Sequence, residues 1–280
     1  ANGQTIWRVN FVQDFGAVFT GEKGQAMGAT RHGYTGSPTI DGEFILVGVG
    51  GQDGASVVCF NKRDGTVQWK SQNDAPGYGG PVVAMVAGIK HVLAFTAEAA
   101  IGLRFDDGAL LWRVPIKTSF GRHVASPIAL GDLVLVGSHQ AGTMALKVTR
   151  AGDGTRVETA WLEKKIAINF SSPVLIDGHL YGLGPAGVMF CADARTGAEK
   201  WSLEIMRGSS NSQAEFIVLK NNILALTETG ELVLVAADPK AGRIVSRLQV
   251  AGQTWCNPAY SDGRLFLRDK AELYSLELQR

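Results

Sequence analysis

The sequence lacks the features that mark several classes of protein. It has no uninterrupted apolar run near the roughly 18 residues that a membrane helix needs, so we expect no membrane span. Its 27 basic and 26 acidic residues leave a formal charge of +1 and are scattered along the chain, which argues against a nucleic-acid partner. It also has neither an initiator Met nor a signal peptide, so we expect a mature form or a fragment.

Cysteine is scarce, and its three copies do not form a disulfide framework. Cys59 and Cys191 occupy equivalent points of two sequence repeats, and equivalent points of separate repeats do not touch. We predict that both are small buried apolar residues rather than a redox pair. Cys256 has no evident partner, and no Cys or His spacing is typical of a zinc site.

Glycine, by contrast, is abundant, with 35 residues, and much of it belongs to a repeat. A glycine followed four residues later by tryptophan recurs at intervals along the chain. Its copies are Gly3 to Trp7, Gly65 to Trp69, Gly108 to Trp112 and Gly197 to Trp201.

A second signature precedes the glycine by about thirty residues: a proline, an apolar stretch, a turn pair and another apolar stretch. The turn pairs are Asp41-Gly42, Gly88-Ile89, Gly131-Asp132, Asp177-Gly178 and Asp262-Gly263, with Asn221-Asn222 in a degenerate copy. Such pairs supply the positive φ of tight hairpins. Each repeat therefore reads as two hairpins, and no segment shows helical periodicity. The fold class is all-β.

Short strands that are apolar on both faces suit sheets stacked side by side, as the blades of a β-propeller are. The segment Cys191 to Trp201, with its Asp193 and Thr196-Gly197, resembles the tryptophan-docking repeat of propellers named for pyrroloquinoline quinone (PQQ). The resemblance covers nearly the whole chain. It weakens where Gly154 lies too far from Trp161 and where Ser246 replaces the tryptophan after Gly242.

We predict one domain over residues 1–280, with six blades of four antiparallel strands. The predicted blades are residues 36–70, 80–114, 126–162, 172–203, 213–248 and 257–278. The last has three strands, and we expect residues 3–9 to pair with it and close the ring. Members of the family commonly have eight blades, so a longer protein with two further upstream blades is the alternative.

Function is expected on the face that carries the longer loops. The ligand-binding candidates there are Arg31, His32, Tyr34, Glu98, Lys117, Arg122, His123, His139, Asn169, Trp255 and Asn257. We predict neither catalytic residues nor a metal site.

Three groups of these candidates suggest different chemistry. The Gly-rich loop from Gln13 to Gly36 is long enough either to bind a ligand or simply to cap the channel. A polar cluster of Lys117, Arg122 and His123 has two interpretations. It is either a binding site for an anion or a basic loop that is simply solvated. His123 and His139 suit a metal or acid–base chemistry, but no carboxylate partner is predicted for them.

The aspartates and tryptophans that recur in the repeats are interpreted as structural residues. The recurring Asp64, Asp107 and Asp193 are explained as turn residues that bond local backbone N–H groups. The tryptophans that close the repeats are expected in the core. Trp255 departs from this pattern because it directly precedes an inner strand.

Two functions follow from the resemblance. One is a non-catalytic scaffold that binds a protein or a small ligand through the loop-rich face, like the family's outer-membrane assembly lipoprotein. The other is a quinoprotein dehydrogenase that oxidises an alcohol or sugar with PQQ and Ca²⁺. The quinoprotein alcohol dehydrogenases use adjacent cysteines, which this chain lacks, so the scaffold is preferred. The resemblance also implies export to the periplasm or the extracellular space, and a monomer is compatible with it.

Overall fold

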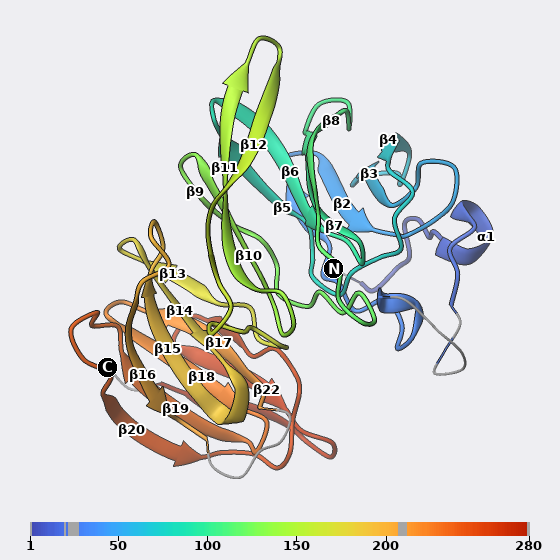
Figure 1. The fold of residues 1–280 in the computed structure, drawn as a ribbon. Coiled ribbons are helices and arrows are strands. Elements are labelled where there is room, and N and C mark those ends of the chain that lie inside the picture. The colour runs from blue at the N-terminus through green and yellow to red at the C-terminus, as the bar shows by residue number, and fades with distance from the viewer. Residues whose placement is uncertain (1, 20, 22–27, 207–211, 279–280) are drawn as a thin grey trace. The chain divides into compact units, whose positions relative to one another are not determined.

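The computed structural model describes residues 2–19, 21, 28–206 and 212–278, and the chain divides into two compact units at residues 164/165. The described residues are all-β, as the sequence predicts, and form six separate antiparallel sheets (Figure 1). In the described residues the α-helical content is a five-residue segment, α1 (Phe11–Phe15). No described helix therefore has the length and apolarity to cross a membrane.

The first unit holds three sheets, each of four strands that are consecutive in sequence. A short 3-10 turn, η1 (Gly28–Thr30), precedes them. The first sheet consists of β1 (Thr39–Asp41), β2 (Phe44–Gly48), β3 (Val57–Asn61) and β4 (Val67–Ser71). The second consists of β5 (Val82–Val86), β6 (Ile89–Phe95), β7 (Ala99–Arg104) and β8 (Leu110–Pro115). The third consists of β9 (Ile128–Leu130), β10 (Leu133–Ser138), β11 (Gly142–Ala151) and β12 (Gly154–Glu163).

The second unit holds two more four-stranded sheets and one of three strands. The fourth sheet consists of β13 (Val174–Ile176), β14 (His179–Leu183), β15 (Val188–Asp193) and β16 (Glu199–Glu204), with a 3-10 turn, η2 (Pro185–Gly187), inside it. The fifth consists of β17 (Ala214–Leu219), β18 (Asn222–Thr227), β19 (Glu231–Ala236) and β20 (Ile244–Gln249). The sixth consists of β21 (Ala259–Ser261), β22 (Arg264–Arg268) and β23 (Leu273–Glu277).

The first two strands of each sheet are joined by tight turns, most at the predicted residues. Asp177 and Gly178 have φ of 47° and 75°, and Asp262 and Gly263 have 51° and 78°, as a two-residue type I′ turn requires. Two predicted pairs are shifted by one residue: the turn residues are Ala87-Gly88 and Lys220-Asn221. The turn chemistry is thus a reliable marker of the hairpins.

The core lies between neighbouring sheets. In the first unit one cluster joins Leu93 and Trp112 of the second sheet to Val134 and Leu146 of the third. Another joins the first sheet to the second. In the second unit one cluster joins the fourth sheet to the fifth, and a further one joins the fifth to the sixth. Because inner strands are sandwiched in this way, β10 is buried along its whole length. Face-to-face stacking of four-stranded antiparallel sheets is the architecture of a β-propeller, and this prediction is confirmed.

Three tryptophan side chains donate a hydrogen bond to a backbone carbonyl just before a glycine turn of the first, second or fifth sheet. The indole Nε1 of Trp69 lies 2.9 Å from the Phe105 carbonyl, and that of Trp201 lies 2.8 Å from the Asp238 carbonyl. Trp7 makes the same contact with Lys62, at 3.0 Å. Since these bonds span 36 to 55 residues, each tryptophan fixes distant segments together.

The strand predicted at residues 3–9 is not present in this structure. Residues 2–10 form no strand, and the sixth sheet has three strands. Trp7 instead lies on the first sheet, where its ring stacks on Phe60 at 6.1 Å. Val9 and Phe11 pack in the same cluster, so apolar burial holds this segment against the first sheet.

The structure also explains where the repeat weakens. β11 and β12 are ten residues each, against three to seven for the other strands of the first unit, and they form a long hairpin (Figure 1). The hairpin places its turn at Gly152, with φ of 60°, well before Trp161. The glycine-to-tryptophan spacing is lost because this hairpin is extended.

Candidate functional site

Most of the predicted site residues lie on loops that follow the fourth strand of a sheet or join its second and third strands. In the first unit these loops are residues 72–81, 96–98, 116–127 and 139–141, together with the segment 28–38 before β1. Backbone hydrogen bonds connect them: the Tyr78 N–H donates to the His123 carbonyl at 2.9 Å, and the Gly28 N–H donates to the Phe120 carbonyl at 2.8 Å. The loops therefore form one cross-bonded layer.

His123 lies inside this layer rather than on its surface. It is fully buried, stacks on the Phe95 ring at 3.9 Å, and donates from Nδ1 to the Thr96 carbonyl at 2.6 Å. Burial lowers the pKa of His123 to about 4, so the ring is neutral at pH 7. Its role is to hold loops together, and it presents no charge to a ligand.

A second buried polar group in the layer, Asp74, is not among the residues predicted from the sequence. Its carboxylate accepts two bonds from the Arg113 guanidinium, at 2.6 and 2.9 Å, and one from the Thr96 hydroxyl at 2.6 Å. Asp74 is 6% exposed. Glu98, a predicted ligand residue, lies at the edge of this network, 3.7 Å from Arg113. No repeat signature includes Asp74 or Arg113, so no sequence signal marked them.

Arg31 and Arg122 converge on one aromatic ring. Their guanidinium carbons lie 4.9 and 5.2 Å from the centroid of Phe120. The Nε atoms of both are buried and have no hydrogen-bond partner in the part of the chain that the structure describes. The sequence placed both arginines on this face but gave no sign that they share a ring.

The remaining candidates of the first unit differ in burial and in their contacts. His139 is half-buried, and its pKa is lowered by burial and by the charge of Arg122. His32 is exposed, with its ring 6.4 Å from that of Tyr78. Tyr34 donates to the Val18 carbonyl at 2.8 Å, which braces the loop, and Lys117 is exposed.

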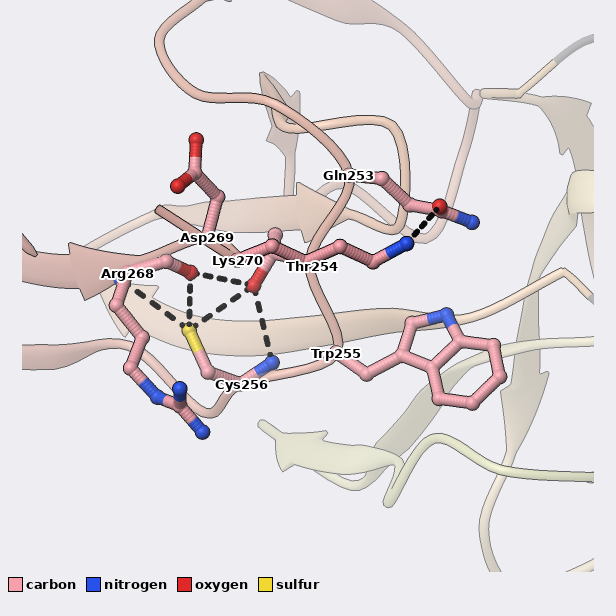
Figure 2. Close-up of a pocket in the computed structure, with 7 residues that line it drawn as sticks. All are labelled: Gln253, Thr254, Trp255, Cys256, Arg268, Asp269 and Lys270. Atoms are coloured by element: carbon pink, nitrogen blue, oxygen red, sulfur yellow. Dashed lines mark hydrogen bonds between the residues drawn. The ribbon is translucent and has the colours of Figure 1, made fainter. Parts of the chain in front are cut away.

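In the second unit, the candidates Trp255 and Asn257 lie on the loop before β21, and Asn169 lies before β13. Asn169 is half-buried and Asn257 is exposed. Trp255 is 64% exposed and borders a pocket of about 340 Å³ (Figure 2). The pocket is lined by Gln253, Thr254, Trp255, Cys256, Arg268, Asp269 and Lys270.

The backbone around this pocket is held by internal hydrogen bonds. The Thr254 hydroxyl donates to the Arg268 carbonyl at 2.6 Å and lies 3.1 Å from the Cys256 sulfur, which links the two sides of the pocket (Figure 2). The Asp269 carboxylate accepts from the N–H groups of Gly252, Ala271 and Glu272 and from the Tyr274 hydroxyl, each at 2.8 Å. These bonds hold the pKa of Asp269 well below its usual range. Asp269 thus acts as a fixed turn anchor.

The side chains that remain available at the pocket are one aromatic and two cations. Figure 2 shows the Trp255 indole and the Arg268 guanidinium extending on opposite sides of Cys256. Lys270 reaches Gln253, with 3.1 Å between Nζ and Oε1. An exposed indole beside positive charge on a rigid frame suits an apolar or aromatic group that carries a carboxylate.

The described residues do not fit a PQQ and Ca²⁺ pair. A calcium site takes 6 to 8 oxygen ligands, whereas the Glu98 carboxylate faces Arg113 and the Asp74 carboxylate is bonded to it. The described part of the chain holds no group of three or more His, Cys, Asp or Glu side chains placed to bind a metal ion. Cys59 and Cys191 are free and buried in separate sheets.

Known proteins resemble this chain in sequence and in fold. At the level of sequence, a curated protein named outer membrane protein assembly factor BamB, from Yersinia pestis, is 24% identical over 218 residues. That match covers 73% of this chain and 51% of the Yersinia protein, so the chain spans about half the length of this relative.

Solved structures show the same propeller fold. BamB from Moraxella catarrhalis matches 88% of this chain and 83% of its own, with a TM-score of 0.52 and 17% identity. The Cps50 (Swd1) β-propeller domain of Myceliophteria thermophila matches with a TM-score of 0.60 and 15% identity. This match covers 88% of this chain and 84% of the Cps50 chain. The quinohemoprotein alcohol dehydrogenase ADHIIG of Pseudomonas putida HK5 matches with a TM-score of 0.56 and 14% identity. This match covers 80% of this chain and 43% of the dehydrogenase chain.

The family model described as outer membrane protein assembly factor BamB matches residues 1–203 and 187–279. The two matched ranges together cover nearly every residue of the chain. The chain therefore belongs to the PQQ-type propeller family of outer membrane protein assembly factor BamB.

Proposed function

We propose that this protein is a non-catalytic binding module for protein partners in outer membrane protein assembly. The proposal is supported by its family and by the pocket at Trp255, where an exposed indole and two cations stand on a hydrogen-bonded frame. An exposed tryptophan on a rigid loop is a typical anchor of a protein interface. Export to the periplasm, and residues 1–280 acting as one domain, are parts of the same proposal.

The chemistry of the pocket indicates the kind of segment that it binds. The indole offers an apolar face, while Arg268 and Lys270 attract negative charge. An extended segment that alternates aromatic and acidic residues places rings and carboxylates at regular intervals. Strands of outer-membrane barrels alternate apolar and polar residues in this manner.

A binding titration tests this function. The probe is a fluorescein-labelled nonapeptide that alternates Phe and Asp, followed by fluorescence anisotropy. We expect saturable binding with a dissociation constant below about 1 mM. Trp255→Ala should weaken binding about tenfold or more.

The control is Leu248→Ala on β20, because Leu248 is 63% exposed and outside the pocket. It should leave the affinity unchanged. A peptide of the same composition with Lys in place of Asp should not bind. Equal affinity of Trp255→Ala and the unmodified protein would contradict the proposal.

A second titration addresses the dehydrogenase alternative. PQQ with Ca²⁺ is added up to about 100 μM, a concentration that saturates micromolar sites. Tryptophan fluorescence and dye-linked alcohol oxidation are recorded in the same samples. We expect both signals to stay flat, and saturable quenching with dye reduction would overturn the non-catalytic assignment.

A further inference from the structure

The loop layer of the first unit carries two positive side chains, Arg31 and Arg122, that have no negative partner among the described residues. Arg31 and Arg122 both lie over the Phe120 ring, at 4.9 and 5.2 Å. Within the described residues neither forms an ion pair, and the Nε–H group of each is buried without a hydrogen bond. Two neighbouring cations with unused buried donors are unfavourable unless an anion joins them.

A third unused nitrogen belongs to His139, on the loop whose neighbouring residue Gln140 bonds to Ser119 of the Arg122 loop. Nδ1 of His139 is buried and has no hydrogen-bond partner among residues 2–19, 21, 28–206 and 212–278, and the charge of Arg122 acts on this ring. Tyr78 is close as well, because both Arg122 and Arg31 oppose the rise that burial causes in its pKa. Polar side chains from different loops thus gather around Arg122.

The segments that carry these groups are locked by their backbones. Gly28 donates to the Phe120 carbonyl, and Ala29 donates to the Pro76 carbonyl, both at 2.8 Å. The Ser119 N–H donates to the Gln140 side chain at 2.6 Å, next to His139. Gly28 has φ of +52°, and a Cβ there would lie 2.1 Å from the Pro76 carbonyl oxygen. The close approach of the loops therefore requires glycine and keeps the donors in place before any ligand arrives.

We propose that Arg31, Arg122 and His139 form a binding site for an oxyanion, meaning the carboxylate or phosphate group of a ligand. Guanidinium groups recognise both through paired N–H donors. Phe120 holds both guanidinium groups close to its ring through cation–π contact. The site is in the first unit and does not depend on the proposed function of the Trp255 pocket.

Arginine Nε–H resonances of the unmodified protein provide a direct test. Inorganic phosphate and glutarate are titrated separately at pH 6.5 to about 50 mM, at constant ionic strength set with NaCl so that screening does not change. We expect two Nε–H signals to shift together and to saturate. Tighter binding of phosphate would indicate a phosphorylated ligand, and tighter binding of glutarate would indicate a carboxylate ligand such as an acidic side chain.

Variants assign the signals to residues. Arg31→Gln and Arg122→Gln should each weaken binding about tenfold or more, since each removes charge-assisted hydrogen bonds. The matched control is Arg156→Gln, which removes an exposed cation of the β11–β12 hairpin and should leave binding unchanged. Near-UV circular dichroism confirms that each variant is folded.

Two results would overturn the site. One is the absence of saturable Nε–H shifts with either anion in the unmodified protein. The other is an equal loss of affinity in Arg156→Gln, which would show that binding reflects net charge alone.

Discussion

The loop regions of the two units use the same repeat to build different surfaces. In the first unit the loops bury polar groups: Asp74 and His123 are 6% and 0% exposed and bond to other loops. In the second unit the corresponding loops leave Trp255 exposed beside a pocket. The repeat therefore sets the spacing of the strands. The polarity of each loop surface depends instead on which loop side chains are buried in hydrogen bonds to other loops and which stay exposed.

The largest difference between the two units is expected in the free energy of unfolding that is lost when an ion pair is removed. Asp74→Ala should lower the free energy of unfolding by about 3 kcal/mol, because it leaves Arg113 and Thr96 without their buried acceptor. Glu231→Ala in the second unit should cost less than about 1 kcal/mol, since its pair with Arg247 is more open to solvent. Urea unfolding of both variants measures this, and equal losses would break the comparison.

His123 gives the first unit a distinctive acid response. Its folded pKa of about 4 lies below the usual histidine value of 6.5, so the unfolded chain takes up the proton first as pH falls. The stabilising effect of the neutral ring is present above about pH 6.5 and is lost toward pH 4, by up to about 3 kcal/mol. Urea unfolding between pH 7 and 4 should show this fall in the unmodified protein.

His123→Phe should remove most of this pH dependence, because Phe has the size to stack on Phe95 but no proton to bind. The control is His179→Gln in β14, a variant that should keep the pH dependence of the unmodified protein. A slope that persists in His123→Phe would assign the acid response to other groups.

Glu215 in the second unit should respond in the opposite direction. Burial raises its pKa from 4.5 to about 7, so its neutral form is stabilising below about pH 4.5. That contribution is lost as pH rises through 7, by about 2 kcal/mol after allowance for partial exposure. Glu215→Gln, measured by urea unfolding from pH 5 to 8, should flatten this dependence, and an unchanged slope would exclude Glu215 as its source.

The smallest difference in the free energy of unfolding is expected between substitutions of two tryptophans, one in each unit. Trp69→Phe should cost about 1 kcal/mol, because the indole N–H bond to the Phe105 carbonyl is lost in the core. Trp255→Phe should change the free energy of unfolding by less than about 0.5 kcal/mol, since the side chain is exposed. Thermal unfolding of the pair checks this, and a large cost at Trp255 would make it a structural residue.

The fold was predictable because its determinants are local and repeated. Asp177-Gly178 and Asp262-Gly263 adopt the positive φ that their turns require, so hairpins follow directly from the sequence. The strand predicted at residues 3–9 failed because the contacts of Trp7 with Phe60 and Lys62 are tertiary and outweigh strand propensity.

The site was predictable only in part. Trp255 was recognisable because it departs from the repeat. The burial of His123 and the pairing of Asp74 with Arg113 were not, since loop paths have no periodicity and bring together residues 27 and 39 positions apart. Likewise, the convergence of Arg31 and Arg122 on Phe120 depends on a backbone bond from Gly28 that no motif encodes.

The most direct test of the binding role is site-specific photo-crosslinking in living cells. A benzophenone amino acid replaces Trp255, or Leu248 as the exposed control, and crosslinked proteins are identified by mass spectrometry. We expect position 255 to crosslink to components or clients of outer membrane protein assembly, and position 248 to give none of these products. Crosslinks at 255 that match those at 248, or that contain no outer-membrane assembly protein, would contradict the proposed function.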